Sequence, residues 1–220
     1  MNKFFLPILL FLLTGLQFRA LPAVTDSTWV DSVYRSLSPE QRIAQLLIIR
    51  AYSCRDSVYN DSLNQIVQKF NVGGLCFFKG SPVNQATLTN RLQRTAATPM
   101  LITTDAEWGL GMRLDSAFSF PRQMALGAIS DDFLIYRMGR VVGRDCRRMG
   151  IQVNFAPVAD VNNNPKNPVI SFRSFGEDPA AVARKSVLYM QGMQDQGIMA
   201  VAKHFPGHGD TDLDSHLTLP

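Results

Sequence analysis

The chain has 220 residues, of which 46% are hydrophobic, so it is long and apolar enough to form one domain with a buried core. Its formal net charge of +4 falls to +2 when Lys3 and Arg19, the only basic residues among the first 23, are subtracted. This positive excess is too small to indicate nucleic-acid binding, and no run of lysines and arginines supports that function. We therefore expect no nucleic-acid partner.

The first 23 residues have the layout of a secretory signal peptide. Lys3 precedes a mostly apolar stretch over 4–16, and the small residues Ala20 and Ala23 follow it. The stretch is too short for a membrane span, and no cysteine directly follows it that could carry a lipid anchor. We expect no stable membrane insertion, and export of residues 24–220 to the periplasm or the cell exterior.

The remainder of the chain alternates between helical patterns and short apolar strands. Ser38 and Pro39 predict a helix start, as an N-cap and a first helical residue. Further helices are predicted over 57–70, 84–96, 130–149 and 178–196. Apolar strand-like segments are predicted over 46–52, 72–78, 99–105, 153–161 and 199–205.

Apolar strands separated by helices predict a parallel sheet in an α/β fold. Polar residues lie at the carboxyl ends of these strands, namely Asp105, Asp160, Lys203 and His204, where a (β/α)8 TIM barrel builds its active site. No G-x-G-x-x-G motif follows a first strand, which argues against a dinucleotide-binding sheet. We expect an incomplete barrel, with about six of the eight β/α units, whose remaining units would follow residue 220.

The segment 203–220 concentrates the groups that transfer protons or bind ligands. It contains all three histidines of the chain, the side chains that titrate nearest to neutral pH. His204 and His208 are separated by Pro206 and Gly207, so the helical spacing of a zinc site is not available, and we predict no metal. The segment is therefore predicted to be an active-site loop.

The three cysteines are too few and too scattered for a disulfide framework. Cys76 lies in an apolar run and is predicted to be a core thiol. Whether Cys54 and Cys146 pair is left open by the sequence.

The segment K-H-F-P-G-H-G-D-T-x-x-D-S-H over 203–216 resembles the signature of the bacterial β-N-acetylglucosaminidases of glycoside hydrolase family 3. The resemblance extends over 38–220 in matching order. It includes L-S-P-E-Q-R-I-A-Q-L-L at the first helix, V-G-G-L before a strand end, T-D-A-E-W-G-L-G-M-R over 104–113 and S-F-R-S-F-G-E-D-P over 171–179.

This resemblance implies a (β/α)8 barrel and a retaining glycosidase that removes terminal β-linked N-acetylglucosamine without a cofactor. The carbohydrate substrates would be peptidoglycan fragments or other amino-sugar glycans. His216 would be the general acid/base and Asp214 the residue that orients it. Residues matching the family's sugar-binding positions are Asp105, Arg113, Arg173, Lys203 and His204. The carboxylate nucleophile would lie on a later strand, beyond residue 220.

Three alternatives remain open at this stage. Arg113 and Arg173 could brace loops through carboxylates such as Glu107 or Glu177 instead of binding sugar. Trp108 stands where the family usually has glycine, and it could stack on a sugar or pack. The chain could also be a β-glucosidase or β-xylosidase of the same family, or a glycan-binding module without catalysis. We expect residues 24–220 alone to be inactive and poorly folded, because an open barrel leaves strand edges unpaired.

Overall fold

A computed structural model describes residues 26–219, which divide between two compact units, residues 1–36 and 37–220. The described part of the first unit is helix α1, Asp26–Ser36. The predicted signal peptide lies outside the described residues. Among the helices of residues 26–219, none combines the length and the apolar character needed to cross a bilayer.

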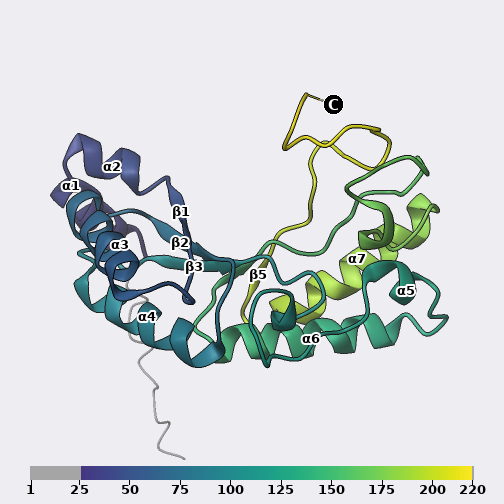
Figure 1. Ribbon diagram of the computed structural model, residues 1–220, viewed down its shortest axis with the longest axis horizontal. Helices are drawn as coiled ribbons and strands as arrows, with labels where there is room; N and C mark the ends of the chain where they lie inside the picture. The colour runs from purple at the N-terminus through teal and green to yellow at the C-terminus, as the bar shows by residue number, and fades with distance from the viewer. Residues whose placement is uncertain (1–25, 220) are drawn as a thin grey trace, which may run out of the picture. The chain divides into compact units, whose positions relative to one another are not determined.

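The second unit is built on a parallel sheet with the strand order β1-β2-β3-β4-β5 (Figure 1). The strands are β1 Ile48–Ala51, β2 Gly74–Phe77, β3 Leu101–Thr104, β4 Val153–Asn154 and β5 Met199–Ala200. Helices α2 Pro39–Ala44, α3 Ser57–Phe70, α4 Pro82–Thr95, α5 Gln123–Gly127, α6 Phe133–Arg148 and α7 Pro179–Gln194 precede or connect them. Two short 3-10 helices, η1 Leu110–Met112 and η2 Ser171–Arg173, lie in the long loops. Strictly sequential parallel strands with helical crossovers are the arrangement of a (β/α)8 barrel.

The register separates the two faces of the sheet. Leu75 on β2 and Ile102 on β3 are paired neighbours and fully buried, on the face that the helices cover. One residue earlier on each strand, Gly74 of β2 pairs with Ile48 of β1 on one side and with Leu101 of β3 on the other. Ile48 and Leu101 are 42% and 41% exposed. Because side chains alternate along a strand, these two residues mark the opposite face, which a closed barrel would line as its interior.

The described sheet has five strands, whereas about six were expected. The fourth strand is also shorter than the predicted segment 153–161. Regular pairing ends before Pro157, which has no N–H to donate, and only an isolated bridge between Val158 and Lys203 continues it. In residues 37–219 β1 and β5 are the outer strands, and exposed Ile48 and Met199 lie on them, as expected for an open barrel.

Local sequence signals account for the helix ends. Ser38 accepts a hydrogen bond from the backbone N–H of Gln41, whose side chain accepts one from Ser38 N–H, so the predicted start of α2 is confirmed. Asp178 caps α7 through Ala180 N–H, and Pro179 is the first residue of that helix.

Helices α6 and α7 pack closely because glycines face each other. An added Cβ at Gly139 would lie 2.4 Å from the carbonyl oxygen of Tyr189, and one at Gly192 would lie 2.3 Å from that of Tyr136. Tyr189 and Met193 of α7 are completely buried. Tyr189 also reaches the loop after β3, since its hydroxyl donates to the Glu107 carbonyl at 3.1 Å. This packing supports the loops that carry the polar site.

Candidate active site

The carboxylate of Asp105 lies between two cations at the carboxyl end of β3. Its Oδ1 accepts a hydrogen bond from Lys203 Nζ at 2.8 Å, and its Oδ2 accepts one from Arg113 Nη2 at 3.0 Å. Lys203 follows β5, so the contact joins strand ends that are 98 residues apart. All three side chains are about one-fifth exposed or less. The structure thus brings these three predicted site residues together.

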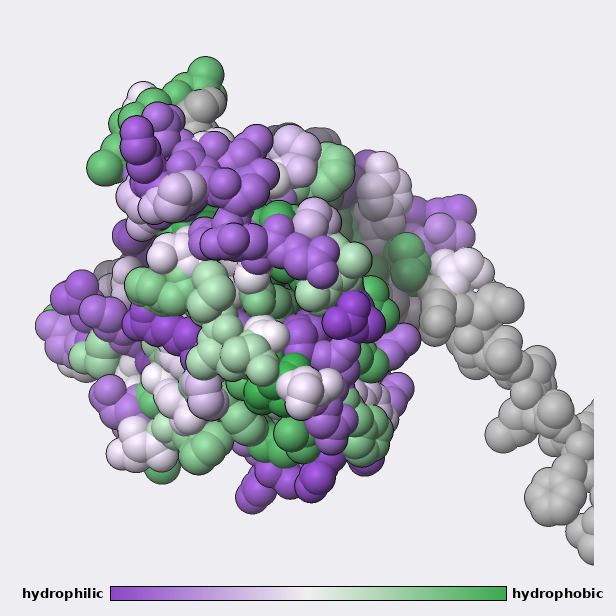
Figure 2. All heavy atoms as spheres, turned by 90° about the vertical axis from the view of Figure 1, so that its right-hand side faces the viewer, coloured by the Kyte–Doolittle hydropathy of each residue, from purple (hydrophilic) through white to green (hydrophobic). Residues whose placement is uncertain are grey.

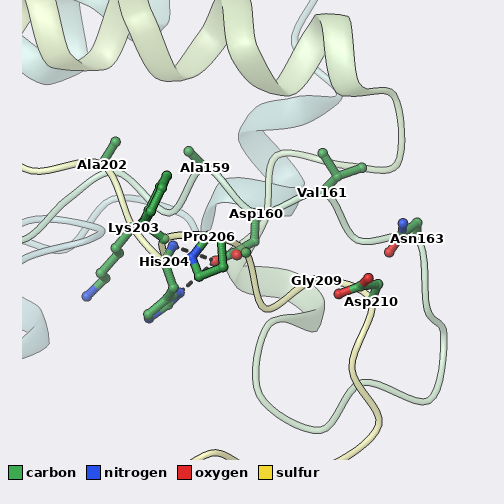
Figure 3. A pocket seen from close by; sticks show the side chains of 12 residues that line it. Ala159, Asp160, Val161, Asn163, Ala202, Lys203, His204, Pro206, Gly209 and Asp210 are labelled. Atoms are coloured by element: carbon green, nitrogen blue, oxygen red, sulfur yellow. Dashed lines mark hydrogen bonds and ion pairs between the residues drawn. The ribbon is translucent and has the colours of Figure 1, made fainter. Parts of the chain in front are cut away.

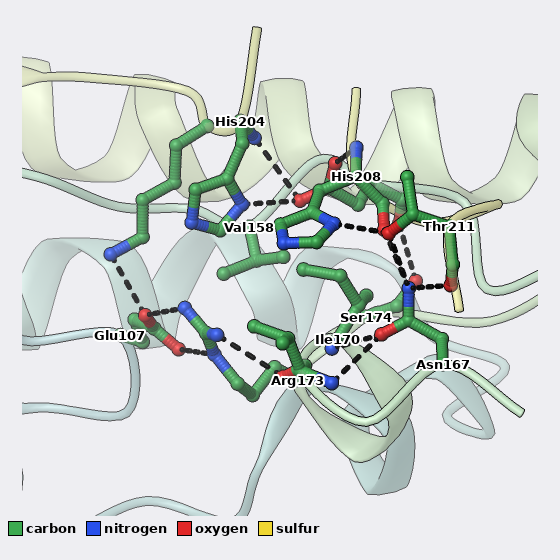
Figure 4. A network of polar contacts seen from close by, with 12 residues as sticks. Glu107, Val158, Asn167, Ile170, Arg173, Ser174, His204, His208 and Thr211 are labelled. Carbon is green, nitrogen blue, oxygen red and sulfur yellow. Dashed lines mark hydrogen bonds and ion pairs between the residues drawn. The ribbon is translucent and has the colours of Figure 1, made fainter. Parts of the chain in front are cut away.

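Glu107 is the second carboxylate of this polar cluster, which consists of Asp105, Glu107, Arg113, Arg173 and Lys203. Glu107 is 1% exposed. Arg173 donates to it from Nη2 at 2.7 Å and Nε at 2.9 Å, and Lys203 Nζ lies 2.8 Å from Oε1 (Figure 4). Burial raises the pKa of Glu107, but the hydrogen bonds from Arg173 and the charge of Lys203 outweigh burial and hold that pKa below its usual value. Arg173 thus holds the Glu107 carboxylate, and Arg113 holds that of Asp105.

Asp160 organises the third part of the site, after β4. Its Oδ2 accepts a hydrogen bond from His204 N at 3.1 Å and lies 2.6 Å from His204 Nδ1, while Oδ1 accepts from His208 N at 2.7 Å. Burial raises the pKa of Asp160, but these hydrogen bonds, led by that of the His204 ring, lower it overall. The sequence placed Asp160 at a strand end without including it among the site residues. Its position after an apolar strand was the signal that could have identified it.

An open hollow of about 370 Å³ adjoins this cluster (Figure 3). Asp160, Lys203 and His204 lie on its wall, together with Asn163 and Asp210. Asp105, Glu107, Arg113 and Arg173 are not among its lining residues, so the hollow borders the cluster from the side of the loop after β5. It offers carboxylate, amide and imidazole groups, which can exchange hydrogen bonds with a polyhydroxylated ligand.

Asn167 binds residues 208–211 of the loop that follows β5. The side-chain nitrogen of Asn167 donates to the carbonyl oxygens of His208 at 2.6 Å and Thr211 at 2.9 Å. His208 Nδ1 lies 2.5 Å from the Thr211 hydroxyl, and His208 is 6% exposed. This part of the loop is therefore fixed against the rest of the site.

The distal part of the loop carries the predicted acid/base pair. His216 Nδ1 lies 2.8 Å from Asp214 Oδ1, which also accepts the His216 backbone N–H at 2.9 Å. These two hydrogen bonds, first the backbone one, lower the pKa of Asp214. The His216 side chain is 80% exposed, and in residues 26–219 no described contact joins it to Asp105, Lys203 or His204.

The face that carries the loop mixes hydrophilic and hydrophobic residues, and the last residues project outward from it (Figure 2). Three apolar side chains of the loop are strongly exposed, namely Phe205, Leu217 and Leu219 at 97%, 85% and 92%. The structure thus brings five of the predicted site residues together and leaves the His216–Asp214 pair facing solvent.

Two remaining expectations concern Trp108 and the cysteines. The Arg122 guanidinium lies 4.9 Å from the centre of the Trp108 ring and 4.2 Å from that of Phe172, so Trp108 packs against an arginine beside the site. Cys54, Cys76 and Cys146 are all free, so Cys54 and Cys146 are not paired. Burial raises the pKa of the Cys146 thiol to about 12.

Relatives share this sequence and architecture. The chain is 37% identical over 171 residues to beta-hexosaminidase A of Pseudoalteromonas piscicida, covering 72% of this chain and 29% of that protein. It is 33% identical over 189 residues to a beta-N-acetylglucosaminidase/beta-glucosidase of Cellulomonas fimi, covering 86% and 33%. A glycoside hydrolase family 3 beta-N-acetylglucosaminidase structure from Paenibacillus sp. str. FPU-7 matches with a TM-score of 0.73 and 39% identity, covering 82% and 35%.

The chain spans about a third of the length of these relatives. A family model described as the glycosyl hydrolase family 3 N terminal domain matches residues 38–220, the part that contains the sheet, the polar cluster and the His216–Asp214 pair. On this match and the parallel β/α architecture, the chain belongs to glycosyl hydrolase family 3.

Proposed function

We propose that the full-length protein is a retaining glycoside hydrolase that removes terminal β-linked N-acetylglucosamine from glycans. The observation that carries the proposal is the Asp214–His216 hydrogen bond in a loop beside the cation–carboxylate cluster of Asp105 and Lys203. The names of the relatives, among them a beta-hexosaminidase and a beta-N-acetylglucosaminidase, support the choice of sugar.

In this proposal the cluster binds the sugar that is cleaved off. Carboxylate oxygens of Asp105 accept hydrogen bonds from ring hydroxyls, and Lys203, Arg113 and Arg173 donate to hydroxyl oxygens. His204, oriented by Asp160 through Nδ1, presents its other ring nitrogen to the ligand. Each of these groups already has a partner in the cluster, so a bound sugar would meet side chains fixed in position.

His216 acts as the general acid/base. Because Nδ1 is held by Asp214, Nε2 remains to protonate the glycosidic oxygen as its bond to the anomeric carbon breaks. In the second step the same nitrogen takes a proton from water, which attacks the glycosyl–enzyme intermediate. This role requires the exposed loop to carry His216 over the bound sugar.

A retaining mechanism also needs a carboxylate nucleophile on the opposite face of the sugar. We expect it beyond residue 220, on a strand that would follow β5. The residue pattern of positions 1–23 supports export, and we propose peptidoglycan fragments or other amino-sugar glycans outside the cytoplasm as substrates.

Hydrolysis of 4-nitrophenyl N-acetyl-β-glucosaminide by the full-length protein tests the proposal. We expect turnover that is lost in His216→Ala and absent with the matching β-glucoside. Turnover of both glycosides would favour the second candidate, a dual-specificity enzyme, which the printed name of the Cellulomonas fimi relative supports. A folded protein that binds N-acetylglucosamine without turnover would be a glycan-binding module.

A further inference from the structure

One guanidinium group bridges two of the loops that carry the polar cluster. The guanidinium carbon of Arg122 lies 4.9 Å from the centre of the Trp108 ring and 4.2 Å from that of the Phe172 ring. Trp108 belongs to the loop after β3, and Phe172 to η2 in the loop after β4. Both strands have a neighbour on either side in the described sheet, so these contacts do not belong to its open edges.

The bridge adjoins the Glu107–Arg173 ion pair in both loops. Trp108 directly follows Glu107 in the sequence, and Phe172 directly precedes Arg173. The two loops are therefore joined at two consecutive positions, once by the ion pair and once through Arg122. An ion pair between long side chains fixes their charged ends, whereas a second contact at the neighbouring residue also fixes the backbone from which each side chain extends.

Arg122 is itself anchored by the residue that follows it. The side-chain nitrogen of Gln123 donates to the Val158 carbonyl at 2.7 Å, and its side-chain oxygen accepts the Val158 N–H at 3.0 Å. Gln123 is 1% exposed, so water does not compete for these hydrogen bonds. Val158 forms an isolated bridge with Lys203, whose carbonyl accepts a hydrogen bond from Ala159 N–H at 2.6 Å. The backbone beside Arg122 is therefore tied to the segment after β5 that carries Lys203.

The side chain of Lys203 returns to the same two acids. Its Nζ donates to Asp105 Oδ1 at 2.8 Å and lies 2.8 Å from Glu107 Oε1. Arg122 thus connects through its ring contacts to the loops of the cluster and through Gln123 to the backbone of its lysine. Hydrogen bonds weaken steeply with distance and angle, so a small displacement of these donors would cost binding of a ligand that they hold.

We propose that Arg122 is a positioning residue for the polar cluster. It holds two aromatic rings, and through them the backbone beside Glu107 and Arg173. The donors of Arg173 and Lys203 thereby stay where a sugar hydroxyl can reach them, while Arg122 itself does not touch the sugar. The inference rests on the proposed function and adds to it a residue that acts through the cluster.

Steady-state kinetics of the full-length protein with 4-nitrophenyl N-acetyl-β-glucosaminide test this role. We expect Arg122→Ala to raise KM by about fivefold and to leave kcat within about twofold, because the cluster would contribute equally to the ground state and the transition state. Arg122 is exposed, so the urea midpoint of the variant should stay close to that of the unaltered protein. A merely structural role would lower this midpoint and leave KM unchanged, and an unchanged KM overturns the proposal.

A conservative variant, a ring variant and a distant arginine accompany this measurement. Arg122→Lys keeps a cation that can lie over a ring but lacks the planar guanidinium, so its KM should lie between those of Arg122→Ala and the unaltered protein. Phe172→Leu keeps apolar volume but removes one ring, and it should also raise KM. Arg94→Ala, at an exposed arginine in the last turn of α4, should leave both constants unchanged. No rescue in Arg122→Lys together with an unchanged KM in Phe172→Leu would overturn the ring contacts as the cause.

A double variant tests whether Arg122 acts through Arg173. Arg173→Lys keeps a charge for Glu107 but loses the two-point geometry of the pair. In that background Arg122→Ala should raise KM by less than about twofold, because the contact that it positions is already lost. If the two single effects multiplied instead, Arg122 would act independently of Arg173, and the positioning role would be overturned.

Calorimetry with N-acetylglucosamine separates this inference from the proposed function. Binding is measured in the His216→Ala background, with and without Arg122→Ala, and turnover of the 4-nitrophenyl glycoside by the unaltered protein is measured in parallel. Turnover with the same KM and the same sugar affinity in the Arg122 variant overturns the inference and leaves the proposed function intact. Weaker sugar binding in the Arg122 variant, without turnover by the unaltered protein, supports the positioning role and overturns the hydrolase assignment.

Discussion

Arg173 and Glu107 form a two-point ion pair between loops that are 66 residues apart in the sequence. Nε and Nη2 of Arg173 lie 2.9 and 2.7 Å from the two carboxylate oxygens of Glu107, whose side chain is 1% exposed. Such a pair fixes both partners in angle as well as in distance. It links the loop after β3 to the loop after β4, so the polar cluster of Asp105, Glu107 and Lys203 depends on it for its shape.

Removing Arg173 should therefore destabilise the fold. In Arg173→Met the Glu107 carboxylate stays buried, and among the described residues 26–219 Lys203 is the one cation that still pairs with it. We expect the free energy of unfolding to fall by about 3 kcal/mol, measured by urea denaturation of the full-length protein. The double variant Glu107→Gln/Arg173→Met should recover part of the loss, since no unpaired charge is then buried. A single variant as stable as the unaltered protein would show that solvent reaches Glu107 freely.

Acid should weaken the same cluster. The pKa values of Glu107 and Asp160 are lowered in the folded protein from ordinary values of 4.5 and 3.8. Groups with a lowered folded pKa stabilise the protein above their unfolded pKa, and this contribution is lost as pH falls through the folded pKa. We expect the free energy of unfolding to decrease below pH 4.5, as measured by denaturant titrations at a series of pH values.

The variant Glu107→Gln provides the control for this pH dependence. It removes one of the two groups, so its free energy of unfolding should change less steeply with pH in the same range. Identical slopes in the variant and the unaltered protein would mean that other carboxylates dominate the acid response.

Gly139 should tolerate no side chain, despite its position inside helix α6. Alanine normally stabilises a helix by about 1 kcal/mol relative to glycine. Here the added Cβ would lie 2.4 Å from the Tyr189 carbonyl oxygen and 3.0 Å from its ring, so α7 would have to move. We expect Gly139→Ala to lower the thermal midpoint, while Arg137→Ala on the exposed side of the same helix leaves it nearly unchanged. A raised midpoint in Gly139→Ala would show that the two helices separate at little cost.

The order of the helices and strands could be predicted because its signals are local. The β/α alternation could be predicted from the N-caps Ser38 and Asp178 and from the apolar strands. The positions of Asp105, Lys203 and His204 at strand ends predicted that they lie near one another, and Asp105 and Lys203 are in contact. The length of β4 was wrong, because an apolar run does not reveal that pairing ends before Pro157. The count of about six strands was likewise one more than the described residues form.

The partners within the site were harder to predict than its members. The sequence left Glu107 as one of several open partners for Arg173, because the contact depends on how two long loops fold together. The role of Asp160 likewise depends on the fold, because the chain after α7 brings the His204 ring and the His208 N–H into contact with its carboxylate. By contrast, Asp214 and His216 are two residues apart, so their contact could be expected from the sequence alone.

In turnover, Asp214 and His216 should behave as one unit. In the proposed mechanism Asp214 acts only through the orientation of His216, so its loss should add nothing once the imidazole is gone. We expect His216→Ala to lower kcat by about a hundredfold or more and Asp214→Asn by about tenfold or more. The double variant should match His216→Ala within about twofold.

Stability provides the control for this cycle, because both side chains lie at the surface and His216 is 80% exposed. All three variants should unfold at the denaturant concentration of the unaltered protein, so that any loss of turnover reflects chemistry. The loss in His216→Ala should also grow when 4-nitrophenol is replaced by a poorer leaving group, which needs the proton more. If the two single losses instead multiplied in the double variant, Asp214 would act independently of His216, and the acid/base assignment would have to change.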